Sequence, residues 1–260
     1  MKFIIGKKIE MTQVWQGEKV IAVTKIQAGP CPVVQVKATN SKDGYSAVQL
    51  GFGERKEKNI RKPQLGHLNK LKVKSEKSKV NLRYLREFRS EAENLNIGDI
   101  VDVSTFAIGD TVKVIGTSKG KGFQGVVKRH HFHGHNKTHG TKDQVRTGGS
   151  IGAGGPQHVF KGLKMPGRMG NGRSTASNLK IIQIDQENNI LYISGAVPGA
   201  RNGLVLISGE GELKVAQPIM EKAEEIKPVE AIDSKPEVKT EEAVTAETAV
   251  EKKEEAPVKV

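Results

Sequence analysis

The stretch from residue 116 to residue 174 constrains the fold of this chain more than any other part of its sequence. It holds 15 glycines, six of the seven histidines and 11 lysines or arginines, but only one acidic residue, Asp143. No ordinary globular core has that composition, because too few apolar side chains are present to offset the conformational entropy of the glycines. We therefore expect a basic, irregular extension that interrupts a folded body.

The segments on both sides of this extension are predicted to be β-strands. They alternate apolar and polar residues and are rich in β-branched side chains, and they lie at 19–26, 32–38, 45–52, 99–106, 110–117, 181–199 and 202–209. The segment 181–199 is expected to form a hairpin that turns at Glu187, Asn188 and Asn189. Short strands at this spacing favour a closed or nearly closed antiparallel barrel. The predicted fold class is thus mainly β, an antiparallel β-barrel interrupted by a long irregular extension, with short helices near 63–73 and 81–93.

The distribution of charge predicts the domain organisation. Residues 217–260 hold 12 acidic and 7 basic residues and no aromatic one, which predicts a disordered acidic tail. Without that tail the net charge rises from +13 to +18. A second basic stretch, 54–89, has 13 basic and 4 acidic residues and is expected on the surface. The predicted order is a first barrel part (1–115) with the basic insertion 54–89, the extension (116–174), a second barrel part (175–216) and the tail (217–260).

Composition excludes several classes of protein. Cys31 is the single cysteine, so an intrachain disulfide and a multi-cysteine zinc site are excluded, and a reducing cytosolic setting fits best. The opening MKFIIGKKIE is broken by Gly6 and two lysines before a signal-peptide core can form. No run of about 18 apolar residues is present to span a membrane. The basic surplus instead indicates a polyanionic partner, either nucleic acid or an anionic membrane surface.

A glycine pattern in the extension superficially matches a dinucleotide-binding turn. Gly120, Gly122 and Gly125 have the G-x-G-x-x-G spacing directly after a predicted strand. The sequence that follows, VVKRHHFHGHNKTHG, lacks the apolar period of the helix that would hold a pyrophosphate. We expect no nucleotide cofactor here. Such glycines also permit close approach to RNA phosphates, which nearby basic side chains would neutralise.

Five clustered histidines raise the question of a metal site. They are His130, His131, His133, His135 and His139, with Asp143 as the nearby carboxylate. A glycine-rich basic run without Cys or Glu is a poor metal site, and the prediction is that no metal is bound. Histidines in this setting more often stack on bases or donate hydrogen bonds to phosphate and sugar groups.

Catalysis is not expected, because no positioned acid, base or nucleophile with a partner is evident and the paired carboxylates lie in the tail. The segment 148–175 can be interpreted as a flexible linker, but linkers are usually serine-rich and less cationic. A cationic strand of small residues with occasional apolar anchors can instead thread between packed RNA helices, which would supply its order.

Several motifs in their order along the chain carry a family resemblance. They are GKKIEMTQVW (6–15), QVKAT (35–39), FAIGDTVKVIGTSKGKGFQGVVKRHHF (106–132), HGTKDQVRTGGSIG (139–152), VFKGLKMPGRMGNGR (159–173) and GAVPGARNGLVLI (195–207). Across nearly all of residues 1–210 the sequence resembles the bacterial form of large-subunit ribosomal protein three, the universal L-three family. It departs from the family pattern at Glu10, at Lys113 and at a loop tip, 152–158, that is about one residue short.

The resemblance implies a structural constituent of the large ribosomal subunit, in the cytoplasm, and not an enzyme. It implies direct binding of large-subunit ribosomal RNA near its 3′ end, a part in early subunit assembly and a loop that reaches towards the peptidyl transferase region. The implied partners are that RNA and neighbouring large-subunit ribosomal proteins, with no membrane and no small-molecule substrate. The candidate RNA-binding residues are Lys119, Lys121, Lys128, Arg129, His130, His131, His133, Lys137, His139, Lys142, Arg146, Lys161, Lys164, Arg168 and Arg173.

Two other readings compete with the ribosomal one. A free RNA-binding chaperone or regulator is the first, since an acidic tail can compete with RNA for a basic loop. A nucleotide-dependent oxidoreductase that uses the glycine turn is the second, and saturable binding of nicotinamide or flavin nucleotides would support it.

Overall fold

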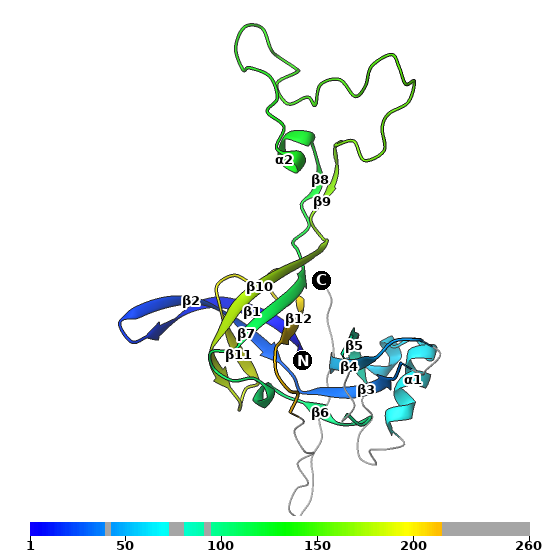
Figure 1. The fold of residues 1–260 in the computed structure, drawn as a ribbon, viewed down its shortest axis with the longest axis vertical. Coiled ribbons are helices and arrows are strands. Elements are labelled where there is room, and N and C mark those ends of the chain that lie inside the picture. The colour runs from blue at the N-terminus through cyan, green and yellow to red at the C-terminus, as the bar shows by residue number, and fades with distance from the viewer. Residues whose placement is uncertain (40–42, 73–80, 91–94, 215–260) are drawn as a thin grey trace, which may run out of the picture. The chain divides into compact units, whose positions relative to one another are not determined.

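Six strands pair side by side in a closed antiparallel ring (Figure 1). The computed structural model describes residues 1–39, 43–72, 81–90 and 95–214, so the predicted tail at 217–260 lies outside the described residues. The order around the ring is β1-β12-β7-β10-β11-β2. Its strands are β1 (Lys2–Gln16), β2 (Lys19–Ala28), β7 (Thr111–Thr117), β10 (Arg173–Asp185), β11 (Ile190–Ser194) and β12 (Leu204–Gly209). The prediction of a mainly β fold is confirmed, as is the hairpin that turns between β10 and β11.

Strand β1 is not among the strands that the sequence pattern predicts. Its residues 3–6 are buried in succession rather than alternately, since both faces of this part of the strand are covered. Gly6 meets β2 at a close approach, where a Cβ would lie 2.7 Å from Cγ2 of Ile26. A period-two pattern is therefore absent from the stretch that closes the ring.

A second, four-stranded sheet packs against β1. Its order is β5-β4-β3-β6, built from β3 (Cys31–Lys37), β4 (Ala47–Glu54), β5 (Leu82–Phe88) and β6 (Ile100–Val101). The ring of Phe3 on β1 stacks on that of Phe88 on β5, with centroids 4.7 Å apart. One continuous apolar cluster joins the two sheets and contains Cys31, whose burial raises the pKa of its thiol to about 12.

The sequence pattern predicts a different arrangement for several of these strands. The prediction that 32–38 and 45–52 belong to the barrel is wrong, because they form the separate sheet. The helix predicted at 81–93 is also wrong, because residues 82–88 form edge strand β5, whose ends Leu82 and Phe88 are buried by tertiary packing. The segment 99–106 forms only β6 and the 3-10 turn η2 (Val103–Thr105). The helix predicted near 63–73 is present as α1 (Lys62–Lys72), after the 3-10 turn η1 (Glu57–Asn59).

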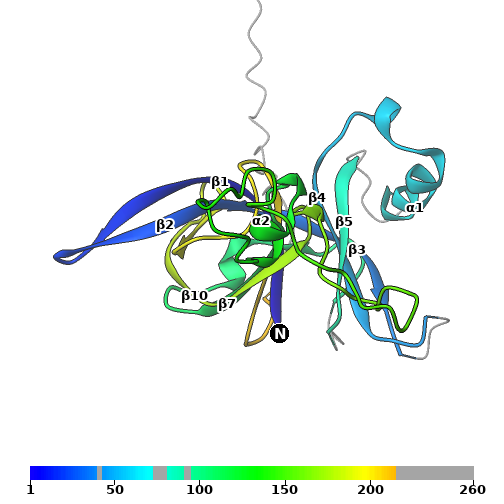
Figure 2. The same cartoon turned by 90° about the horizontal axis from the view of Figure 1, so that it is seen from above.

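The barrel strands β7 and β10 continue into a narrow ribbon (Figure 1), and Figure 2 shows the same fold from above. The ribbon pairs β8 (Gly122–Gln124) with β9 (Gly167–Met169) in antiparallel fashion, and the short helix α2 (Val126–His130) follows β8. Between α2 and β9 the chain runs through irregular loops, as the glycine content predicted.

Candidate nucleic-acid interface

The neck of the extension is held by backbone hydrogen bonds between its outgoing and returning limbs. Arg173 pairs with Thr117, the amide of Ser118 donates to the carbonyl of Gly172 at 2.9 Å, and the amide of Lys121 donates to that of Met169 at 2.9 Å. Gly170 has a φ of +72°, and a Cβ there would collide with the carbonyl oxygen of Lys119. A glycine is required at this point because the two limbs touch through their backbones.

Helix α2 ties the outgoing limb to the returning one. Nη1 of Arg129 donates to the carbonyl oxygen of Met165 at 2.7 Å, and Nε2 of His130 lies 3.2 Å from the same oxygen. A Cβ at Gly167 would lie 2.5 Å from that guanidinium, so the small residue leaves room for it. Arg129 and His130, both half-buried, thus support the loop from within.

One apolar side chain forms the base of the loop. Val126 on α2 is the single buried residue of 117–172, a range that the structure describes throughout. Gly148 passes close to it, since a Cβ there would lie 3.1 Å from a methyl group of Val126 and 3.8 Å from the ring of Phe132. This small contact, together with the ties to Met165, gives the base of the extension some packing of its own.

The other thirteen candidate side chains are exposed. Lys119 and Lys121 lie in the neck, Lys128 is on α2, and Arg168 and Arg173 are on β9 and β10, while the remaining eight lie on the irregular loops: His131, His133, Lys137, His139, Lys142, Arg146, Lys161 and Lys164. No basic residue of 116–174 forms an ion pair with any other residue that the structure describes. These side chains are spread along the whole extension and do not line a pocket. We call residues 116–174 the cationic limb.

Lys8 is a basic residue near the neck that the sequence analysis did not select. It is 8% exposed and donates from Nζ to the carbonyl oxygen of Val197 at 2.7 Å. Burial lowers the pKa of its ammonium, and the nearby charge of Lys119 lowers it further. Phe123 on β8 was missed as well, although its place in a basic glycine-rich run was a usable signal.

The glycine turn at 120–125 does not sit in a dinucleotide-binding unit. Contrary to the sequence analysis, a helix does follow it, but α2 has only 5 residues and β8 pairs antiparallel with β9 instead of feeding a parallel strand. The clustered histidines do not converge either, because the described residues contain no group of three or more His, Cys, Asp or Glu side chains able to hold a metal ion.

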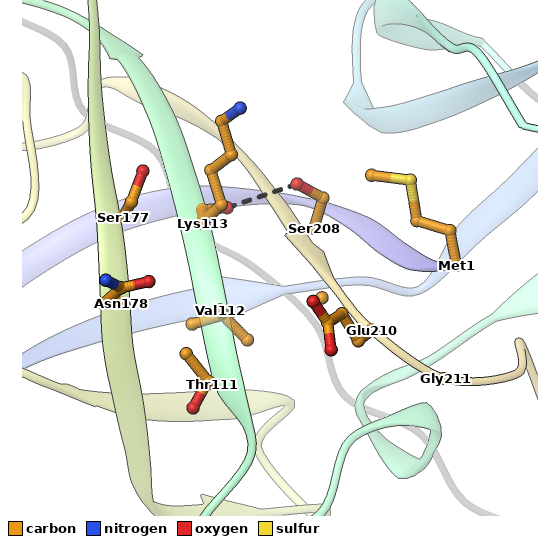
Figure 3. Close-up of a pocket in the computed structure, with 10 residues that line it drawn as sticks. Met1, Thr111, Val112, Lys113, Ser177, Asn178, Ser208, Glu210 and Gly211 are labelled. Carbon is orange, nitrogen blue, oxygen red and sulfur yellow. Dashed lines mark hydrogen bonds between the residues drawn. The ribbon is translucent and has the colours of Figure 1, made fainter.

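A hollow of about 710 Å³ lies on the barrel, lined by residues of β7, β10 and β12 and by Met1 (Figure 3). Its lining includes Lys113 and Glu210. The hydroxyl of Ser208 donates a hydrogen bond to the carbonyl oxygen of Lys113 at 3.5 Å. These side chains do not form a nucleophile with a base. None of the helices in the described ranges is long and apolar enough to cross a membrane.

Comparison with known proteins decides the family. A family model described as "Ribosomal protein L3" matches residues 86–190. The large ribosomal subunit protein uL3 of Herpetosiphon aurantiacus is 50% identical over 210 residues, which cover 79% of this chain and 94% of that protein. Those of Petrotoga mobilis and Desulfitobacterium hafniense are 48% and 47% identical over 208 residues, covering 80% and 79% of this chain and 94% of each relative. The chain belongs to the ribosomal protein L3 family.

Membership of the L3 family makes the chain a structural protein of the large ribosomal subunit and not an enzyme. Its place is the ribosome, which in bacteria is a cytoplasmic particle. The ribosomal prediction is confirmed at this level, and none of the basic residues of the cationic limb forms an ion pair with another described residue.

Proposed function

We propose that this chain binds large-subunit ribosomal RNA directly through the extension 116–174, supports early assembly of the subunit and carries the loop tip towards the peptidyl transferase region. The observation that carries the proposal is the set of exposed basic side chains without ion-pair partners among the described residues. Phosphates are the partners that such a set fits best, because each neutralised phosphate releases a bound counterion.

The backbone of the extension favours the same partner. Its glycines allow RNA to approach the main chain closely, and double-stranded RNA is recognised mainly by shape, phosphates and 2′-hydroxyls rather than by sequence. The ties from Arg129 and His130 to Met165 hold the two limbs together near the neck. Because the two limbs are already tied together near the neck, less conformational entropy is lost when the outer loop becomes ordered on RNA.

The reach towards the peptidyl transferase region and the role in assembly rest on the family resemblance. The outer loop offers the exposed apolar residues Ile151, Val159, Phe160 and Leu163 as anchors among RNA helices. Neighbouring large-subunit proteins complete the set of proposed partners.

Co-sedimentation tests the proposal. Tagged full-length protein is expected to stay with the large subunit in stoichiometric amount through a sucrose gradient after a high-salt wash, which removes loose electrostatic binders. Ultraviolet crosslinking should then join peptides of 116–174 to ribosomal RNA near the peptidyl transferase region. Release into the soluble fraction would instead favour a free RNA-binding chaperone or regulator.

A further inference from the structure

Phe123 is the most exposed of the large apolar side chains that the structure describes, at 76% of its surface. It is the middle residue of β8, in the ribbon that leads from the barrel into the extension (Figure 1). Exposing a whole aromatic ring to water forfeits the stabilisation that burial would give it. The ring therefore contributes little to folding, and a role in binding explains its position better.

The surroundings of the ring are open and cationic. Phe123 is directly opposite Arg168 in the register of the ribbon, so the two side chains share one face. On either side of it, Gly122 and Gly125 have no heavy atom within 4 Å of the position that a Cβ would take. No aromatic or cationic group of the described residues stacks on the ring of Phe123.

A flat ring with free faces beside an arginine is the arrangement that proteins use for unpaired bases. Single-stranded nucleotides stack on aromatic side chains, while adjacent cations contact the flanking phosphates. A protein partner fits less well, because the cores of protein interfaces are depleted in lysine whereas Lys121 lies two residues before this ring.

We propose that Phe123 is a stacking platform for one unpaired base of the ribosomal RNA, with Arg168 contacting an adjacent phosphate. The inference rests on the proposed function and adds a recognition mode to it. Duplex-shaped RNA engages the limb by its charge, whereas the neck selects a bulged or looped nucleotide.

The first experiment compares full-length variants for binding to a transcript of the 3′ part of large-subunit RNA. Phe123→Ala is expected to weaken affinity about 5- to 150-fold, the range for loss of one stacked base. Phe123→Tyr should bind as the wild type does, and Phe123→Leu should bind as weakly as the alanine variant. The slope of log affinity against log salt should stay unchanged, because no charge is removed. Ile108→Ala, whose isoleucine is 67% exposed outside the extension, is the matched control and should bind normally.

A spectroscopic test reports stacking itself. Trp15 is the only tryptophan, so a Trp15→Phe, Phe123→Trp double variant has its single indole on β8. Quenching of its fluorescence on adding the transcript supports the proposal. Wild-type affinity in Phe123→Ala or Phe123→Leu overturns it and leaves direct RNA binding intact. Loss of ribosome retention with unchanged RNA affinity also overturns it, since the ring then contacts a protein. Absence of binding by the wild type refutes the proposed function itself.

Discussion

The barrel and the extension treat charge and apolar surface in opposite ways. In the barrel, Lys2 meets Asp110 at 2.6 Å, and Glu10 lies 3.6 Å from Lys25 and 3.4 Å from Arg201. In the extension, the basic side chains have no acidic partner within the described chain, and one residue of 117–172 is buried. The barrel pairs some of its own charges, whereas the basic side chains of the extension are open to a partner.

Two phenylalanines show the same contrast within one residue type. Phe3 is fully buried and stacks on Phe88 between the two sheets, whereas Phe123 is 76% exposed on the ribbon. The first side chain stabilises the fold, and we infer that the second stabilises a complex. A substitution at each position should therefore move a different measurement.

The largest expected effect on the folded protein is that of Phe3→Ala. Truncating a fully buried phenylalanine leaves a cavity and should lower the free energy of unfolding by about 3–5 kcal/mol. Phe123→Ala should change that free energy by less than about 0.5 kcal/mol. Denaturant unfolding of the full-length variants, followed by circular dichroism, measures both. Similar losses at the two positions would mean that the ribbon is packed in solution, which contradicts the comparison.

Neutralising three exposed lysines of the neck and of α2 should give the next effect. The triple change Lys119→Ala, Lys121→Ala and Lys128→Ala is expected to weaken binding of the RNA transcript on the order of 100-fold at 0.1 M salt. It should also lower the salt slope by about 2 to 3. Arg129 is left intact, because it holds Met165 and its loss would disturb the loop itself.

The matched control for the lysine variant neutralises three tail residues, Lys252, Lys253 and Lys259. We expect that control to change affinity and salt slope only slightly. An equal effect from the tail lysines would show that binding follows net charge and not the surface of the extension.

The sequence predicts those parts of the molecule that obey simple periodicity. Strand β7, with its alternating burial from Thr111 to Thr117, and the hairpin that turns at Asn189 follow local rules. Strand β1 does not, since two sheets bury both of its faces. Edge strand β5 resembles a helix in its residues and is decided by the burial of Leu82 and Phe88. Long-range pairing, which no local pattern contains, accounts for these failures.

The sequence predicts the charge of the candidate site. It does not predict which of the basic side chains hold the loop together and which point to solvent. Composition alone identified the cationic limb, and most of its residues are exposed. It did not separate Arg129 and His130, which bind a backbone carbonyl, from lysines that point to solvent. The difference between these two groups of residues arises because the returning chain brings the carbonyl of Met165 next to Arg129, 36 residues earlier in the sequence. The exposure of Phe123 is a property of the folded ribbon, and its place in a basic glycine-rich run is the signal that the sequence offers for it.

The smallest expected effect is a dependence of the barrel's unfolding free energy on pH, through the carboxylate of Asp110. Although partial burial alone raises the pKa of Asp110, hydrogen bonds from the Lys2 ammonium and the Ala107 amide hold it below its usual value. A lowered pKa stabilises the fold at pH values above the unfolded value of about 3.9, and this contribution is lost as pH falls through the folded pKa. Asp110→Asn should therefore cost about 1 kcal/mol at pH 7 and almost nothing once the wild-type carboxyl is protonated.

Asp143→Asn supplies the matched control for this pH effect in the extension. Asp143 is exposed and has no ion pair within the described chain, so its substitution should leave the unfolding free energy unchanged at every pH. Unfolding curves of both variants and the wild type at pH 7 and at about pH 3 make the measurement. A cost of Asp110→Asn that persists at the lower pH would mean that the amide fails sterically, and that the barrel does not depend on this paired charge.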